Sequence, residues 1–440
     1  MSDPHPTGPE PTLAVALVRA REAACLTQDE LAVRSGLSVR AIRNLETGHT
    51  ARPRRQSLVL LAEALELAPG ETRRLLRLPR GEQPPARAPG AGPAELPAAP
   101  RRRLVGRERL VEALAARLPG PGGPAVVVGP PGAGKTGLVL HTAHAVRDRF
   151  PGGQVYVDLH PASCRPFTPD LLVRRILRSL GDAVAARDPE EARARLRDAL
   201  SGRRVLVVLD NAVSEAQVRP LLVDGGRSAV LVAARRELSA LPEQFRVPVG
   251  PLESGDAYRM LADLAGARRT AAQRPAALRI VRSCAGLPLA LHIAGLWLTA
   301  RPHRGLADLA DRLAEEGERL GALRVGDLAL DASVAAYYRP LPPASRAALH
   351  ELSSLGAEFG FEDVVCRLSP SRRQAMDLLE DLLHRQLVRA GEPDRAGRVR
   401  YRLYDAVRLY VAHGTVPAGP CRPGRRARDA GGRGRVTEAS

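Results

Sequence analysis

Lysine is nearly absent from this chain. It occurs once among 440 residues, at Lys135, while Lys and Arg together total 66, so arginine carries the other basic charges. The five cysteines are odd in number and scattered, which fits neither a disulfide framework nor a zinc-ligand spacing. The sequence also lacks a signal-peptide pattern and any apolar run approaching about 18 residues, the length that a membrane-spanning helix requires. These absences favour the reducing cytoplasm, and nothing in the sequence directs the chain into or across a membrane.

Aromatic residues are scarce as well, at 3%, whereas the chain holds 40 glycines and 38 prolines. This composition indicates helix-rich domains separated by flexible joints, and the length predicts about two to four of them. The formal net charge of +18 favours an anionic partner. Nucleic acid is the leading candidate and an anionic membrane surface the lesser one.

The order of patterns along the chain predicts a multidomain protein of the α and α/β classes. Apolar runs alternate with helical stretches over residues 104–250, as in a parallel sheet. Residues 321–413 end in two short apolar runs around a turn-rich segment, as in a winged helix. The predicted segments are a helical domain (1–80), a flexible Pro/Ala/Gly linker (81–103), an α/β domain (104–250), a helical domain (251–320), a winged-helix domain (321–413) and a disordered basic tail (414–440).

The single lysine lies in a phosphate-binding motif. Residues 129–136 read GPPGAGKT, directly after the apolar run 125–128 and before a helical pattern, which is the strand, loop and helix context of a P-loop. A compact ammonium fits between the β- and γ-phosphates, and the wide guanidinium of arginine cannot replace it. The alternative is a Gly/Pro-rich turn before a helix. The predicted nucleotide ligands here are Gly129, Pro130, Gly132, Ala133, Gly134, Lys135 and Thr136.

A P-loop also needs a metal site. The run 205–209 predicts a buried strand that ends in Asp210, whose carboxylate would hold Mg²⁺ together with Thr136. The alternative for Asp210 is a solvated strand end. Asn211 follows where a fast hydrolase would commonly have an acidic group, and an amide cannot accept a proton. We therefore expect ATP and ADP as ligands, with hydrolysis that is slow at most.

The N-terminal domain has the marks of a helix-turn-helix. Thr27 and Glu30 form a capping box, Gly36 suits the positive φ of a tight turn, and Ser38 caps a second helix. The start of that helix presents Val39, Arg40, Arg43 and Asn44. A helical hairpin used for protein contacts is the alternative.

Residues 12 to 78 resemble the XRE-type helix-turn-helix of phage repressors. The resemblance implies that Val39 and Arg40 face the base edges of double-stranded DNA, while Gln28, Ser38 and Asn44 mostly contact its backbone. Arg40 would read a guanine, because a guanidinium pairs bidentately with O6 and N7. Val39 departs from the polar residue often found there and could touch only a thymine methyl group.

Several further motifs resemble those of the NB-ARC proteins, which belong to the STAND class of signal-transduction ATPases. They are VGR at 105–107, AVLVAARR at 229–236 and CAGLPLAL at 284–291. With the helix-turn-helix, they are similar to bacterial regulators that join an XRE-type domain to this module. The resemblance implies a closed ADP state and an open ATP state, with Arg107 beside the adenine, Arg235 sensing the γ-phosphate and Pro288 near the base and ribose.

The chain departs from this family in two places. Leu403-Tyr404-Asp405 stands where a triplet with a histidine would contact the ADP β-phosphate, so Tyr404 either donates from its phenol or only packs beneath the wing. The sequence also stops after a basic tail, where family members continue into a repeat array. That tail either contacts DNA phosphates non-specifically or is a solvated end.

The leading interpretation is a transcriptional regulator whose nucleotide state controls self-association and DNA binding. The alternatives are an ATPase motor or remodeller that acts on DNA or protein, and a signalling scaffold for which DNA binding is secondary.

Overall fold

The computed structural model describes residues 13–77 and 92–413, apart from short gaps at 25, 27, 47–49, 51–52, 54, 66, 68, 100–102, 119–122, 161–166, 183–187, 224, 357 and 369–370. Thr27 of the predicted capping box, residues 81–91 of the predicted linker and the predicted disordered tail lie outside the described residues. Among the described helices, none is long and apolar enough to cross a membrane.

The N-terminal domain is a bundle of short helices. They are α1 (Leu13–Ala23), α2 (Gln28–Ser35), α3 (Val39–Glu46), α4 (Arg55–Ala64) and α5 (Pro69–Arg77). Leu17, Leu31, Ile42 and Leu58 are buried in its core. Because apolar residues recur on one face of each helix, the opposite face of α3 remains polar and exposed.

The next domain is built on a parallel five-stranded sheet with the order β2-β3-β4-β1-β5. The strands are β1 (Ala125–Val128), β2 (Gly153–Asp158), β3 (Val205–Ala212), β4 (Ala229–Ala234) and β5 (Phe245–Pro248). Four of them match apolar runs that the sequence predicts. The sequence analysis missed β5, because this short edge strand alternates exposed and buried residues and has no continuous apolar run.

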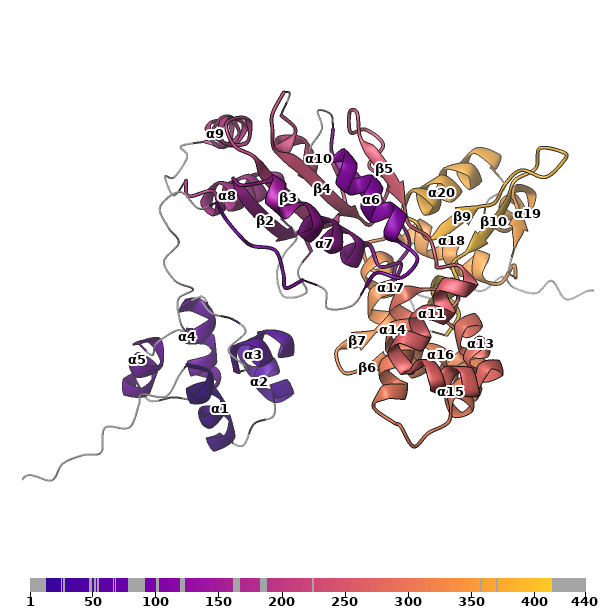
Figure 1. Cartoon of the computed structure of the whole chain (residues 1–440), viewed down its shortest axis with the longest axis horizontal. Helices are drawn as coiled ribbons and strands as arrows, with labels where there is room; N and C mark the ends of the chain where they lie inside the picture. Colours follow the sequence, from indigo (N-terminus) through magenta and orange to yellow (C-terminus); the bar gives the residue numbers. More distant parts are fainter. Residues whose placement is uncertain are drawn as a thin grey trace, which may run out of the picture.

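Helices cover both faces of this sheet (Figure 1). Successive side chains of a strand point to opposite faces, so Val127 packs toward α6 (Glu108–Arg117) and α7 (Lys135–Val146), while Val126 packs toward the other face. That face is covered by α8 (Pro169–Ser179) and α9 (Pro189–Ser201). The short elements η1 (Arg147–Arg149), α10 (Glu215–Val218) and η2 (Arg219–Leu221) complete the domain. This arrangement confirms the predicted α/β class.

The structure corrects the predicted flexible linker at 81–103 over residues 92–99. Ala94 forms a parallel bridge with Gln154 of β2, and Glu95 forms an ion pair with Arg175 of α8 at 2.9 Å. The backbone N–H of Glu95 donates to the carbonyl of Gln154 at 2.9 Å. Since β2 is an edge strand, its unpaired backbone groups bind this segment despite a composition that cannot form a core of its own.

The C-terminal half is mostly helical. Its first helices are α11 (Ser254–Ala265), α12 (Ala267–Ala272), α13 (Arg274–Ser283), α14 (Pro288–Thr299), α15 (Leu306–Ala314) and α16 (Glu316–Ala322). The hairpin of β6 (Arg324–Val325) and β7 (Leu328–Ala329) then leads into α17 (Leu330–Tyr338). One apolar core continues from these helices into the last part of the chain.

That last part has the order of a winged helix. Its elements are α18 (Pro343–Ser353), β8 (Phe359–Gly360), α19 (Phe361–Leu368), α20 (Arg372–His384), β9 (Val388–Ala390), β10 (Arg400–Leu403) and α21 (Asp405–His413). β9 and β10 pair antiparallel, as the turn-rich segment between them predicts, and β8 joins them in a three-stranded sheet. The winged-helix part also contacts the parallel sheet domain, since the backbone N–H of Glu237 donates to the carbonyl of His384 in α20 at 2.8 Å.

Candidate nucleotide site and DNA-reading face

The P-loop connects the carboxyl end of β1 to the first turn of α7. Gly134 stands at the N-cap of α7 with φ 86°, a conformation that glycine adopts without steric cost. Gly129 lies against the β5 side, where an added Cβ would be 2.0 Å from the carbonyl oxygen of Val249. The loop therefore needs glycine at both positions, and the backbone N–H groups of the first turn of α7 can bind an anion.

Lys135 is the buried cation of this loop, with 9% of the residue exposed. Its Nζ donates to the carbonyl oxygens of Gly129 and Pro130, both at 2.8 Å. Burial lowers the pKa of Lys135 to about 7; nearby Asp210 opposes this shift and nearby Arg235 adds to it. A buried ammonium at the start of a helix is suited to phosphate oxygens.

Asp210 lies in β3 beside the start of α7. Its Oδ1 accepts from the hydroxyl of Thr136 at 3.1 Å, and its Oδ2 accepts from the phenol of Tyr156 at 3.1 Å. Burial raises the pKa of Asp210, although the Thr136 hydrogen bond opposes the rise. A hydroxyl and one carboxylate fit Mg²⁺, which usually takes few protein ligands and completes its shell with phosphate and water. The described residues contain no group of three or more His, Cys, Asp or Glu side chains that could hold a metal ion.

Asn211 connects the neighbouring charged groups. It adopts φ 61°, a conformation that Asn tolerates better than most residues. Its Nδ2 donates to Oδ1 of Asp158 at 2.9 Å, and its Oδ1 accepts from Nε of Arg235 at 3.0 Å. Asp158 ends β2 directly opposite Asp210 in the sheet register. Asn211 thus fixes the guanidinium of Arg235 relative to the end of β2.

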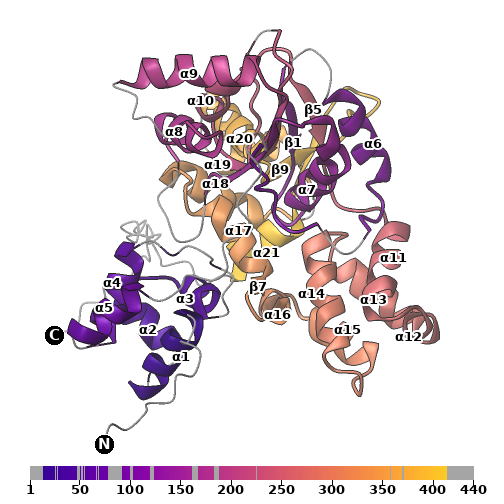
Figure 2. The ribbon, with the colours of Figure 1, turned by 60° about the vertical axis from the view of Figure 1, so that its left-hand side comes forward.

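Helix α17 covers the P-loop from the C-terminal half (Figure 2). Nη1 of Arg235 donates to the carbonyl of Ala336 at 3.2 Å. The phenol of Tyr337 donates to the carbonyl of Gly129 at 3.4 Å, and burial raises the pKa of this phenol. Leu330 Cδ1 lies 3.3 Å from where a Cβ on Gly132 would stand. Both ends of α17 therefore contact the phosphate-binding loop.

The remaining predicted nucleotide residues lie at different distances from this loop. Pro288, at the start of α14, is 3.5 Å from the Cβ position of Gly134. Arg107 caps α6 and donates to the carbonyl of Gly250, while its buried Nε has no partner among the described residues. Burial lowers the pKa of Arg107, against the effect of Asp256. An unpartnered buried donor fits a polar ligand such as an adenine.

Tyr404 lies between the wing and the start of α21. Its ring is 5.9 Å from the guanidinium carbon of Arg389, and it packs on the C-terminal core. Burial raises the pKa of its phenol, which Arg389 opposes. Within the described part of the chain, the tyrosine that reaches the P-loop is Tyr337.

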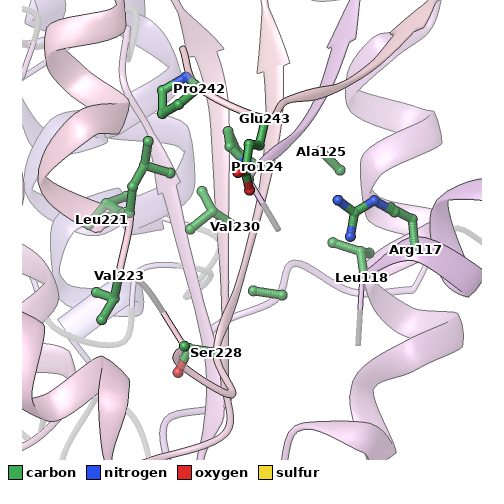
Figure 3. A pocket seen from close by; sticks show the side chains of 14 residues that line it. Arg117, Leu118, Pro124, Ala125, Leu221, Val223, Ser228, Val230, Pro242 and Glu243 are labelled. Carbon is green, nitrogen blue, oxygen red and sulfur yellow. The ribbon is translucent and has the colours of Figure 1, made fainter. Parts of the chain in front are cut away.

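A separate cavity of about 280 Å³ lies near the amino ends of the strands, whereas the P-loop lies at their carboxyl ends. Figure 3 shows Arg117, Pro124, Val230 and Glu243 around it, close to the amino ends of the strands. The P-loop follows the carboxyl end of β1, so this cavity is not part of the nucleotide site.

The residues predicted to contact DNA lie on α3 and next to it. Gly36 has φ 68° in the turn, and the Ser38 hydroxyl accepts from the N–H of Ala41 at 3.2 Å, which caps α3. Arg40 and Arg43 are exposed, Asn44 is half-buried, and Val39 packs partly on the core. Nε2 of Gln28 donates to Glu46 at 2.7 Å.

This face of α3 is turned toward the nucleotide-binding part of the chain. Nη1 of Arg43 lies 2.5 Å from Oδ2 of Asp327 in the turn between β6 and β7. Burial, Asp210 and Asp158 all raise the pKa of Tyr156, and the charge of Arg40 opposes that rise. Arg43 thus pairs with the hairpin that leads into α17, and the charge of Arg40 acts on Tyr156, which donates to Asp210.

Sequence reasoning missed Tyr156, Asp158 and Tyr337. The sequence contains a usable signal for Asp158, because this residue follows an apolar run that predicts a strand. The carboxyl ends of parallel strands lie at the same end of a sheet, so Asp158 is expected near Asp210. Tyr337 had none, because it contacts Gly129 from 208 positions away through the docking of another domain.

Fold and site together define a P-loop ATPase domain preceded by a helix-turn-helix domain. The sequence profile described as the AAA ATPase domain matches residues 103–396, more than half of the chain, and the chain belongs to this family. A profile described as helix-turn-helix matches residues 17–71. These matches confirm the predicted combination of the two modules.

Two curated relatives share much of the sequence. The chain is 40% identical to the regulatory protein AfsR of Streptomyces coelicolor over 283 aligned residues. These residues cover 64% of this chain and 28% of the relative. It is 38% identical over 326 residues to the regulatory protein AfsR of Streptomyces griseus, covering 72% of this chain and 33% of the relative. The chain therefore spans about a third of the length of these relatives.

Solved structures resemble the fold more remotely. A Walker-type ATPase of Pyrococcus abyssi has a TM-score of 0.44 at 15% identity, covering 72% of this chain and 97% of that chain. A STAND protein with a tetratricopeptide repeat sensor from Pyrococcus horikoshii has a TM-score of 0.31 at 15% identity, covering 76% and 45%.

Proposed function

We propose that this chain is a DNA-binding transcriptional regulator that is switched by its bound nucleotide. Its domains are those delimited above at 1–80, 104–250, 251–320 and 321–413. The observation that carries the proposal is the contact between Arg43 and Asp327. A residue expected to bind DNA is paired with the hairpin that leads into α17, the helix that covers the P-loop.

The nucleotide is ADP or ATP with Mg²⁺. Lys135 would bind the phosphates, Thr136 and Asp210 would hold the metal, and Arg107 and Pro288 would lie on the adenosine side. Mg²⁺ supplies charge neutralisation between phosphates when bound. The buried Lys135 and the glycines of the loop support this assignment. Because Asn211 is an amide held by Asp158 and Arg235, hydrolysis is slow and serves to reset the switch.

DNA binding uses the exposed face of α3. Arg40 reads a base, with Val39 and Arg43 beside it, while Gln28, Ser38 and Asn44 mostly contact the DNA backbone. A single helix-turn-helix reads only one half-site, so two copies of the chain pair on double-stranded DNA. The net charge of +18 supports a polyanionic partner, and the regulatory proteins among the relatives support a regulatory role. The chain acts in the cytoplasm.

DNA selection followed by affinity measurement tests this proposal. Fragments retained by the full-length protein from a random DNA pool would be titrated with MgADP and with a slowly hydrolysed ATP analogue. Arg40→Ala should weaken binding to the selected sequence by about 1 to 3 kcal/mol without changing ADP affinity. Arg312→Ala, an exposed arginine on α15, is the matched control for net charge and should leave DNA affinity nearly unchanged.

Identical DNA affinity with both nucleotides would contradict the switch. Rapid steady-state hydrolysis, near the roughly 10 per second typical of enzymes, would favour an ATPase motor or remodeller instead.

A further inference from the structure

Two cations of the nucleotide site face one aromatic ring. Nζ of Lys135 lies 5.3 Å from the centroid of the Tyr337 ring, and the guanidinium carbon of Arg235 lies 5.8 Å from it. Both distances are within cation–π range. Tyr337 is 8% exposed, so these contacts are shielded from water. The ring therefore lies beside both the lysine of the P-loop and the arginine that follows β4.

The same two cations are the groups that a terminal phosphate would join. Under the proposed function, Lys135 binds the β-phosphate of ADP or ATP, whereas only the γ-phosphate of ATP reaches Arg235. Arg235 is also bound elsewhere in the structure, because its Nη1 donates to the carbonyl of Ala336 on α17. A γ-phosphate bound by both Lys135 and Arg235 would compete with the Tyr337 ring for the space beside these cations and with the carbonyl of Ala336 for Arg235.

We propose that Tyr337 determines nucleotide specificity by occupying the space beside Lys135 and Arg235, so that ADP binds with α17 in place and ATP binds only when α17 withdraws. This inference rests on the proposed nucleotide site. The ring is the active part, because the phenol contributes only a long hydrogen bond of 3.4 Å to Gly129. Tyr337 is a positioning residue for this switch, and its neighbour Tyr338 is not part of it.

Variants at the two neighbouring tyrosines test the proposal in the full-length protein. Titration calorimetry with MgADP and with the magnesium complex of ATPγS gives the ratio of the two affinities. Tyr337→Leu should shift this ratio about tenfold toward ATPγS, because the cation–π contacts that hold the ring are lost. Tyr337→Phe keeps the ring and should keep the ratio.

Tyr338→Leu is the matched control, because the phenol of Tyr338 lies 3.1 Å from Nε2 of His350 and its ring packs on Tyr410, inside the C-terminal core. It should leave the ratio unchanged. An unchanged ratio in Tyr337→Leu, with nucleotide binding intact, would overturn the proposal.

Hydrogen exchange on the unmodified protein is independent of whether Tyr337→Leu folds. ATPγS should accelerate amide exchange in Leu330–Tyr338, and ADP should not. Equal exchange with both nucleotides would overturn the proposal. If the affinity ratio shifts in Tyr337→Leu but DNA affinity never depends on nucleotide, the role of Tyr337 stands and the proposed regulator fails. If the unmodified protein binds neither nucleotide, both fail.

Discussion

The ion pair between Arg43 and Asp327 predicts a gain in DNA affinity when it is removed. The size of that gain follows from how far the two side chains are exposed to solvent. The side chains are 44% and 61% exposed, and their charged atoms lie 2.5 Å apart. An exposed pair contributes about 0.2 to 1 kcal/mol. Asp327→Ala should therefore release Arg43 for DNA and raise DNA affinity by about 1.5- to 5-fold when ADP is bound.

The assay is fluorescence anisotropy on a labelled operator at two ionic strengths. The gain should be largest near about 0.05 M salt and shrink toward about 0.3 M, because salt screens exposed charges. Asp331→Ala is the matched control: it removes the same charge from the same segment, but Asp331 pairs with Arg324 at 2.7 Å. In an Arg43→Ala background, Asp327→Ala should have no effect.

Two results would refute the reasoning. An equal gain in Asp331→Ala would mean that any lost negative charge improves DNA binding. A gain that persists without Arg43 would mean that Asp327 acts through another group.

Substitutions at four further positions test the nucleotide site. Lys135→Ala should abolish ATP binding, and Asp210→Ala should keep weak ATP binding that no longer depends on magnesium. Calorimetry with and without Mg²⁺ measures both effects, and an unchanged ATP affinity in Lys135→Ala would disprove the site. Asn211→Asp places a carboxylate against Asp158, where an amide N–H now donates. The Asn211→Asp protein should therefore melt at a lower temperature than Asn211→Gly, in which glycine keeps the positive φ without the like charge. The reverse order of melting temperatures would contradict this. Gly129→Ala puts a Cβ 2.0 Å from a backbone oxygen and should cost about 1 to 3 kcal/mol in thermal melts, and a wild-type melting temperature would show that the loop can shift.

The sequence predicts the parts of this site that depend on neighbouring residues. The P-loop is one continuous segment, and its glycines and its lysine follow from what phosphate requires within eight positions. Asp210 follows from an apolar run, 205–209, that ends in a carboxylate, although β3 continues to Ala212. The turn and cap of the helix-turn-helix are likewise local, since Gly36 and Ser38 act within a few residues of α3.

The sequence does not predict contacts that depend on how separate elements meet. Asp158 and Asp210 are adjacent only because β2 pairs with β3. Residues 92–99 look like a spacer by composition, but the open edge of β2 offers backbone partners to any extended segment that reaches it. Tyr337 reaches Gly129 only because the C-terminal half packs over the P-loop.

Helix α17 and the hairpin before it explain how the two ends of the chain can communicate. Asp327 lies at the start of this segment and contacts the DNA-reading helix, while Tyr337 lies near its end and contacts the P-loop. A nine-residue helix is about 13 Å long and moves as one rigid element. A displacement that withdraws Tyr337 therefore also moves the turn that holds Arg43. The coupling needs no change within either domain, because α17 carries Tyr337 and follows directly on the hairpin that carries Asp327.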